Sequence, residues 1–252
     1  MVVGCANRKG GTGKTSTAGN IAFELSRTHR VAVIDGDAQG SLSSWLLNGQ
    51  KHGPELVDVL TERHDLADAL VKIHEGLHLL PSFLGGDLRA YAETKAGSKP
   101  FAFTSLCEQL EAKGFQFVVV DLAPGLGTFE QGAIAAMDRA LLVLEPEFLS
   151  VEGLGGLLDD LEAIIRDRRA QVRYNWLVAN RVNISFARHR VYLGALGERW
   201  KDYRLFLVRQ GAAVSEAQTV HEPLAVYAPK DDRALPGYRE LAEALKEEYG
   251  QR

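Results

Sequence analysis

One short segment limits this chain more than any other feature, because it is rich in glycine and joins an apolar strand pattern to a helical one. It occupies residues 7–16 and reads NRKGGTGKTS. Glycines here let backbone N–H groups close around phosphate oxygens, and the N-terminus of the following helix adds partial positive charge. We expect Lys14 to reach the β- and γ-phosphates of a nucleotide and the Thr15 hydroxyl to ligate magnesium. A strict phosphate loop has glycine where Arg8 stands, and the alternative is a glycine-rich turn without a ligand.

The rest of the chain alternates short apolar runs with helical patterns. This alternation predicts an α/β fold: a single-domain, doubly wound, mainly parallel sheet with helices on both faces. We expect one domain over 1–252, because no linker or composition break divides the chain. The expected strands are Val2–Ala6, Val31–Asp35, Leu77–Leu80, Phe117–Asp121, Ala140–Leu144, Trp176–Ala179, Leu205–Val208 and Leu224–Tyr227. The expected helices cover about 14–28, 55–61, 65–72, 87–95, 102–113, 128–137, 150–169, 187–200, 212–220 and 235–249.

Two further motifs follow expected strands, which is where ligands bind in such sheets. Asp35 and Asp37 end the second strand, and two carboxylates there are costly unless they are hydrogen-bonded or face a cation. We expect Asp37 to position a water or to lie near magnesium; capping of a helix that begins near Ser41 is the alternative. Asp121 follows the apolar run 117–120, as in the second magnesium-binding strand of nucleotide hydrolases. An ordinary buried strand that ends in a capping aspartate is the alternative.

Composition excludes several classes of protein. Hydrophobic residues make up 46% of the 252 residues and charged residues 25%, which is not the composition of a disordered, collagen-like or coiled-coil chain. No apolar run reaches the roughly 18 residues of a membrane helix, and the N-terminal residues lack a signal-peptide pattern. The two cysteines, Cys5 and Cys107, cannot form a disulfide framework or a four-ligand zinc site. We therefore expect a cytoplasmic protein.

A basic block lies inside this slightly acidic chain. The formal net charge is −4, yet residues 161–210 contain 11 Lys/Arg and only 4 Asp/Glu. A surface for phosphate backbones and a solvated helical face are both consistent with this charge alone.

The three motifs, in this order, resemble a known family. Residues 9–16 resemble the deviant Walker A box of the ParA/MinD partition ATPases, whose signature is the early lysine, here Lys9. The segment 35–41 resembles their switch I, with Ala38 in place of the usual proline and Ser41 where asparagine is common. Residues 121–124 resemble their Walker B and switch II, with one proline in place of two. The likeness continues through 146–147, 150–153, 180–181, 215–217 and 226–229, and so covers essentially the whole chain.

The resemblance implies a magnesium-dependent ATPase that forms an ATP-sandwich homodimer, in which each site is completed by the other subunit. It implies that Lys9 reaches the partner's phosphates and that Asp37 organises the attacking water. It also implies that Asn180 and the loop near Arg209 surround adenine, although that loop lacks the proline that many members have before it. The expected catalytic residues are Lys9, Lys14, Asp37 and Asp121. The expected ATP-binding residues are Lys9, Gly10, Gly11, Thr12, Gly13, Lys14, Thr15, Ser16, Asn180 and Arg209, and the expected magnesium residues are Thr15, Asp37 and Asp121.

Within the family, ParA-like dimers bind DNA non-specifically through C-terminal basic residues, and the basic block lies where the resemblance puts them. Its members would contact phosphates without sequence preference. Arg166, Arg168 and Arg169 cluster at the end of an expected helix, where the alternative role of a cation is to offset the helix dipole. Membrane targeting of the MinD kind is not expected, because the last helical pattern, 238–249, is acidic. The expected DNA contacts are Arg166, Arg168, Arg169, Arg188, Arg190 and Arg204.

Three functions stay open at this point. The first is partition of a chromosome or plasmid, on the nucleoid, with a ParB-like centromere-binding partner. The second is a positioning ATPase that distributes a protein cargo over the nucleoid. The third is a nucleotide switch that does not bind DNA. An N-terminal helix-turn-helix domain is not expected, because the phosphate loop begins almost at the first residue.

Overall fold

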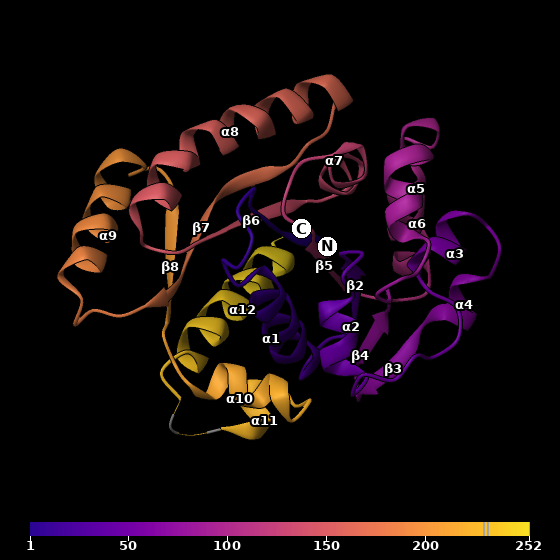
Figure 1. Cartoon of the computed structure of the whole chain (residues 1–252), viewed down its shortest axis with the longest axis horizontal. Helices are drawn as coiled ribbons and strands as arrows, with labels where there is room; N and C mark the ends of the chain where they lie inside the picture. The colour runs from indigo at the N-terminus through magenta and orange to yellow at the C-terminus, as the bar shows by residue number, and fades with distance from the viewer. Residues whose placement is uncertain (229, 231, 252) are drawn as a thin grey trace.

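Eight strands form one sheet in the computed structural model, which describes residues 1–228, 230 and 232–251 (Figure 1). Pro229, the last residue of the family likeness, lies outside this part of the chain. The strands are ordered β3-β4-β2-β5-β1-β6-β7-β8 across the sheet, and every neighbouring pair is parallel except β3 and β4. The predicted α/β fold with a mainly parallel sheet is thus confirmed. The strands are β1 (Val2–Ala6), β2 (Val31–Gly36), β3 (Val71–His74), β4 (Leu77–Leu80), β5 (Phe117–Leu122), β6 (Arg139–Leu144), β7 (Arg173–Val182) and β8 (Arg204–Arg209).

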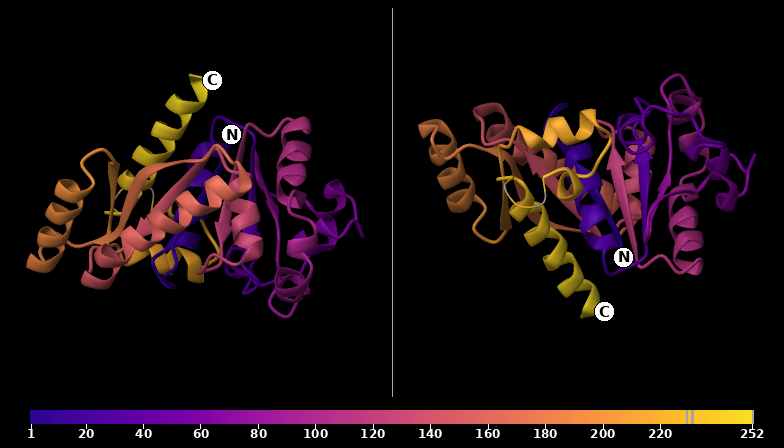
Figure 2. Two further views of the ribbon diagram at one scale, coloured as in Figure 1. Left: turned by 90° about the horizontal axis from the view of Figure 1, so that it is seen from above. Right: turned by 90° about the horizontal axis from the view of Figure 1, so that it is seen from below.

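Helices cover both faces of the sheet (Figure 2). One face carries α1 (Lys14–Ser26), α2 (Ser41–Leu46), α10 (Ala213–Thr219), α11 (Leu224–Tyr227) and α12 (Leu235–Gly250). The other face carries α3 (Leu56–Leu60), α4 (Leu66–Ala69), α5 (Leu88–Thr94), the 3-10 turn η1 (Ala96–Ser98), α6 (Ala102–Ala112), α7 (Thr128–Ala135), α8 (Phe148–Arg168) and α9 (Ala187–Arg199).

Each central strand contributes side chains to both helix layers. Val2 and Ala6 of β1 pack against the face of the sheet that carries α3 to α9. Val3 and Cys5 pack against the opposite face, which carries α1, α2, α10, α11 and α12. This alternation follows from the two-residue period of a strand and makes the strand apolar on both sides. Cys5 and Cys107 are free thiols, and both are buried.

The parallel sheet has two unlike edges, and their names are used below. The carboxyl edge is where β1, β2, β5, β6 and β7 end, and the amino edge is where the same strands begin. A loop that follows a strand therefore lies at the carboxyl edge, and the C-terminus of a helix that leads into a strand lies at the amino edge.

The expected strand at Leu224–Tyr227 is wrong, because these residues form helix α11. A four-residue apolar run has too little periodicity to separate a strand from a helix. Tertiary contacts decide it here: the Leu224 N–H, an unsatisfied donor of the first helical turn, donates to Asn20 Oδ1 at 3.0 Å.

The expected helix over 65–72 is too long. Helix α4 ends at Ala69, and Val71–His74 instead form β3, which pairs antiparallel with β4. Gly76 makes the turn between them with φ +79°, a left-handed conformation that glycine adopts readily. Pairing with a neighbouring strand outweighs the local helical preference.

Within the described residues, no helix combines the length and the apolar character that crossing a bilayer requires.

Candidate nucleotide site

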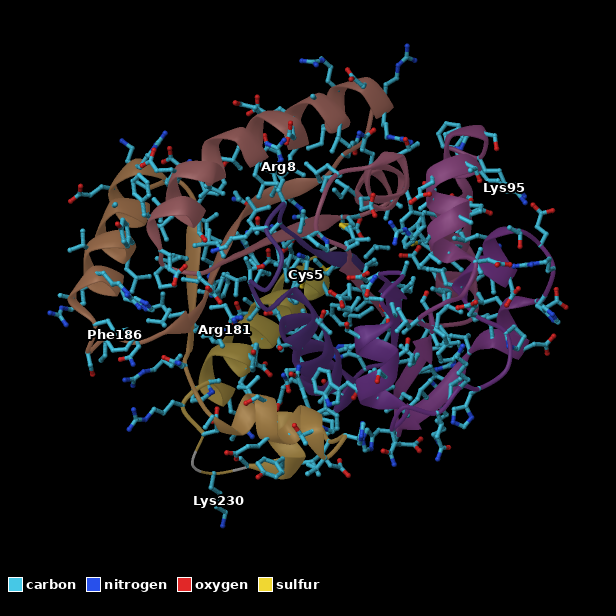
Figure 3. The ribbon with its side chains drawn as sticks, viewed as in Figure 1. Cys5, Arg8, Lys95, Arg181, Phe186 and Lys230 are labelled. Atoms are coloured by element: carbon cyan, nitrogen blue, oxygen red, sulfur yellow. The ribbon has the colours of Figure 1, made fainter. Side chains whose placement is uncertain are left out.

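The glycine-rich segment forms a loop between β1 and α1 at the carboxyl edge, close to the labelled Arg181 (Figure 3). Gly13 immediately precedes α1 with φ +90°, a backbone conformation that side chains disfavour. The loop borders a cavity of about 670 Å³, which is within the usual range for ligand pockets. The described lining residues are Gly10, Gly11, Gly13, Lys14, Thr15, Ser16, Asp37, Gln39, Ser41, Ser44, Trp45, Leu122, Pro124, Arg181, Ser215, Gln218, Thr219 and His221.

Lys14 is the buried cation of this cavity. Its side chain is 6% exposed, and Nζ donates one hydrogen bond, to the Lys9 carbonyl at 3.3 Å. Burial lowers the pKa of Lys14, while the negative charge of Asp121 opposes that change. An ammonium has three donors, so the remaining ones are available to oxygens in the cavity.

Asp35 is the last residue but one of β2 and Asp37 comes directly after the strand, but the two carboxylates have different surroundings. Asp35 is fully buried, and its Oδ2 accepts hydrogen bonds from Ser43 N–H and Ser43 Oγ, both at 2.8 Å. Burial raises its pKa to about 7. Asp37 lines the cavity, and its Oδ1 accepts from Gln39 N–H at 2.9 Å. The alternative role for this motif is capping of a helix that begins near Ser41, which is α2. Asp35 fills that role, because it accepts the Ser43 N–H in the first turn of α2.

Asp121 has no such support. It is fully buried at the end of β5, and neither of its carboxylate oxygens has a hydrogen-bond partner in the described part of the structure. Burial raises its pKa well above the ordinary value and the charge of Asp35 raises it further, while the nearby Thr15 hydroxyl and the charge of Lys14 act in the opposite direction. An orphaned buried carboxylate is costly, and a divalent cation or its bound water would satisfy it. These residues therefore fit magnesium, which Thr15, Asp37 and Asp121 would hold directly or through water.

The two basic residues before the glycines point toward α8. Lys9 Nζ lies 3.4 Å from Glu147 Oε2, and Arg8 Nη1 lies 3.1 Å from Asp160 Oδ2. Both cations are well exposed, at 41% for Lys9 and 58% for Arg8. Surface pairs of this kind contribute little to stability, so Lys9 can exchange its partner at small cost.

The expected adenine contacts occupy different places. Asn180 is 3% exposed, and its Nδ2 donates to the Thr12 carbonyl at 2.9 Å. Arg209 is exposed at the end of β8. Neither belongs to the cavity lining among the described residues, so their contact with adenine stays a prediction.

Sequence reasoning assigned no role to several residues of the cavity wall. Gln218 of α10 donates to Ser16 Oγ at 2.9 Å, which ties α10 to the phosphate loop. Arg181 reaches both the loop and Glu145. The family likeness at 180–181 and 215–217 was the available signal, but it carried no geometry.

The six arginines expected to bind DNA are divided between the two edges. Arg188 and Arg190 lie on α9 just after β7 ends, at the carboxyl edge, and both are exposed. The α8 group, Arg166, Arg168 and Arg169, ends the helix that leads into β7, at the amino edge (Figure 1). Arg204 begins β8, also at the amino edge, and its guanidinium lies 4.6 Å from the centroid of the Phe206 ring.

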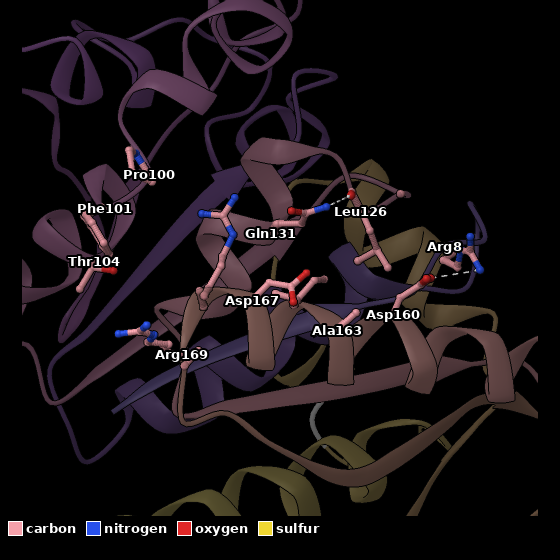
Figure 4. A pocket seen from close by; sticks show the side chains of 15 residues that line it. Arg8, Pro100, Phe101, Thr104, Leu126, Gln131, Asp160, Ala163, Asp167 and Arg169 are labelled. Carbon is pink, nitrogen blue, oxygen red and sulfur yellow. Dashed lines mark hydrogen bonds and ion pairs between the residues drawn. The ribbon is translucent and has the colours of Figure 1, made fainter.

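Two members of the α8 group, Arg168 and Arg169, also border a second cavity, of about 1120 Å³, between α6, α7 and α8 (Figure 4). The two arginines share its wall with Asp160, Asp167 and Phe101. Arg166 forms an ion pair with Asp167 at 3.2 Å. Acidic side chains among these arginines make this end of α8 a poorer surface for phosphates than the start of α9.

Comparison with known proteins agrees with this geometry. A family model described as an AAA domain matches residues 1–174. The chromosome-partitioning ATPase Soj of Thermus thermophilus is 30% identical over 96% of this chain and 94% of its own length. An uncharacterized protein of Borreliella burgdorferi is 31% identical over 94% and 96%. The chromosome partitioning protein ParA of Caulobacter vibrioides is 33% identical over 65% of this chain and 62% of its own.

Solved structures share the fold. A plasmid partition protein from Borrelia burgdorferi bound to AMPPNP superposes with a TM-score of 0.81 at 21% identity, covering 98% of this chain and 99% of that one. A Cyanothece McdA–ATP complex gives a TM-score of 0.83 at 21% identity, covering 97% and 96%. A phosphate loop between the first strand and helix of a mainly parallel sheet defines a P-loop nucleotide-binding protein. Within that class, the chain belongs to the ParA/MinD family of ATPases with a deviant Walker A box.

Proposed function

We propose that this chain is an ATPase that dimerises on ATP, binds DNA without sequence preference as the dimer, and acts in partition with a ParB-like partner. The observation that carries the proposal is the meeting of one buried cation, Lys14, with one orphaned buried carboxylate, Asp121, beside the phosphate loop. A buried cation and a buried anion that both have unused hydrogen-bonding capacity suit a ligand that carries phosphate and a metal ion.

The roles of the residues follow from where they lie. Lys14 and the loop N–H groups would bind and orient the phosphates, and Asp37, which lines the same cavity, would hold the attacking water in line. Lys9 would leave Glu147 for the partner's phosphates, so dimerisation and turnover would depend on each other. Magnesium, when bound, would neutralise charge on the phosphate oxygens.

We assign DNA binding to Arg188 and Arg190, because both are exposed at the carboxyl edge, the edge of the sheet that also holds the nucleotide cavity. The same protein chemistry would serve a positioning ATPase, which differs only in its partner. A gene for a centromere-binding protein beside this one would favour partition.

The test is binding of a random-sequence DNA duplex with no nucleotide, with ADP and with ATP, each at low and high salt. We expect binding only with ATP, weakening as salt rises. Lys9→Ala is the matched variant: it should bind ATP but remain monomeric in light scattering and bind no DNA. DNA binding of equal strength with and without ATP would contradict the proposal that ATP-dependent dimerisation precedes DNA binding. No binding under any condition would remove DNA from the proposal and leave the nucleotide switch.

A further inference from the structure

Two consecutive residues at the end of β7 hold two consecutive carbonyls of the phosphate loop. Asn180 Nδ2 donates to the Thr12 carbonyl at 2.9 Å, and Arg181 Nη1 donates to the Gly11 carbonyl, also at 2.9 Å. Neighbouring residues of a regular strand point to opposite faces of the sheet. Both side chains can therefore reach one loop only if the strand is locally distorted.

That distortion is present. The pairing of β7 with β8 shifts register between Ala179 and Val182, which marks a bulge that contains both residues. Arg181 has φ +53°, a left-handed conformation that residues other than glycine rarely adopt. Bulges beside functional sites re-aim side chains, and here the bulge turns Arg181 to the same side as Asn180.

Both side chains are fixed by further contacts. Arg181 Nη1 also lies 2.7 Å from Oε1 of Glu145, a carboxylate that is 15% exposed just after β6. Asn180 is 3% exposed and packs so closely against Gly13 that a Cβ at Gly13 would overlap its Nδ2. The contact explains why glycine is required at that position in addition to its φ.

The direction of these bonds determines the direction of the loop amides. In a trans peptide the C=O and the following N–H point opposite ways, and no cis peptide occurs in the described chain. Carbonyls of Gly11 and Thr12 that are held toward β7 therefore turn the N–H groups of Thr12 and Gly13 away from it. Among the described residues, neither N–H donates a hydrogen bond.

We infer that Asn180 and Arg181 are positioning residues that preform the phosphate loop, so that its amides are set for phosphate oxygens before any nucleotide binds. The inference rests on the proposed nucleotide binding and deepens it. It gives Asn180 a role toward the phosphates that does not depend on the base.

The test compares ATP with inorganic tripolyphosphate, which has the phosphates but no base, by displacement of a fluorescent ATP analogue. Asn180→Ala, Asn180→Asp and Arg181→Gly should each weaken ATP and tripolyphosphate by the same factor, about tenfold, which corresponds to about 1.4 kcal/mol. Asn180→Asp is isosteric but replaces the donor with a charged acceptor. Arg199→Ala, which removes an arginine at the far end of α9, should change neither affinity.

Arg181→Gly separates positioning from general stability. Glycine suits φ +53°, so the midpoint of thermal unfolding without nucleotide should not fall, although binding weakens. Loss of ATP affinity with unchanged tripolyphosphate affinity would overturn the inference and return Asn180 to the base. Wild-type protein that binds ATP but is not displaced by tripolyphosphate would also overturn it. Wild-type protein that binds neither would refute the proposed function itself.

Discussion

Two buried charges, Arg139 at the amino edge of the sheet and Asp121 at the carboxyl edge, have opposite surroundings. At the amino edge, Arg139 is 4% exposed, and its guanidinium donates to both carboxylate oxygens of Glu248, at 2.6 and 3.1 Å. It also donates to Asn175 at 2.8 Å and lies 3.9 Å from the centroid of the Trp176 ring. At the carboxyl edge, Asp121 is fully buried and has no hydrogen-bond partner among the described residues.

The difference teaches how to separate structure from function in this fold. A buried charge whose hydrogen bonds are all made within the chain holds elements together, here β6, β7 and α12. A buried charge whose bonds are unmade lowers stability and is retained for a ligand.

The largest expected effect is on folding, at the amino edge. Glu248→Ala should lower the free energy of unfolding by about 3–5 kcal/mol, because it leaves Arg139 buried without its counter-charge. Chemical denaturation measures this. Glu243→Ala, on the same helix, removes the exposed carboxylate that pairs with Lys246 and should cost less than about 1 kcal/mol. Similar losses in the two variants would break the comparison.

The next effect is on turnover, at the carboxyl edge. Asp121→Asn should reduce phosphate release from ATP by about a hundredfold or more, the cost of losing a group that organises transition-state charge. Its free energy of unfolding without nucleotide should fall much less than that of Glu248→Ala, since the amide keeps the shape of the side chain and removes a buried carboxylate without a hydrogen-bond partner, which offsets the loss of the negative charge near Lys14. A destabilisation as large as that of Glu248→Ala would show that Asp121 is a structural charge after all.

A smaller effect separates the arginines of the two edges. Arg188→Glu with Arg190→Glu should weaken ATP-dependent DNA binding and reduce its dependence on salt, by about 0.9 in the logarithmic slope for each phosphate that the variant no longer neutralises. Arg166→Glu with Arg168→Glu makes the same change of charge at the amino edge and should alter the slope little. Fluorescence anisotropy over a salt series measures both, and the reverse ranking would move the DNA surface to α8.

The smallest effect concerns His189, a titratable group at the carboxyl edge that has a hydrogen-bond partner. His189 is 6% exposed, and its Nδ1 accepts from Asn183 N–H at 3.1 Å. Burial holds the pKa of His189 below its ordinary value of 6.5, and the charge of Arg188 lowers it further. The neutral ring therefore contributes stability above pH 6.5, which is lost as pH falls below 6.5 toward the folded-state pKa.

We expect the free energy of unfolding of the wild type to exceed that of His189→Gln by less than about 1 kcal/mol at pH 8 and to lose that advantage by pH 5. Urea titrations across this range are the measurement. A difference that is constant with pH would mean that the hydrogen bond survives protonation or is not formed.

Local patterns predicted much of the fold and part of the site. The run from Val118 to Asp121 and the glycine-rich loop were recognisable because a strand and a turn each depend on a few adjacent residues. The same reasoning failed at Leu224–Tyr227 and at Val71–His74, where a side chain far along the chain or a neighbouring strand made the choice. It also could not place the arginines, since charge counted along a sequence has no direction in space.

By itself, the sequence determined most of the order of strands and helices, the phosphate loop and the carboxylates at the ends of β2 and β5. Only the tertiary structure decided which charges are satisfied. Glu248 reaches Arg139 across 109 residues, and Asn180 reaches Thr12 across 168. The physical reason is that conformation is encoded over a few neighbouring residues, whereas desolvation and hydrogen bonding of a buried group depend on everything that packs around it.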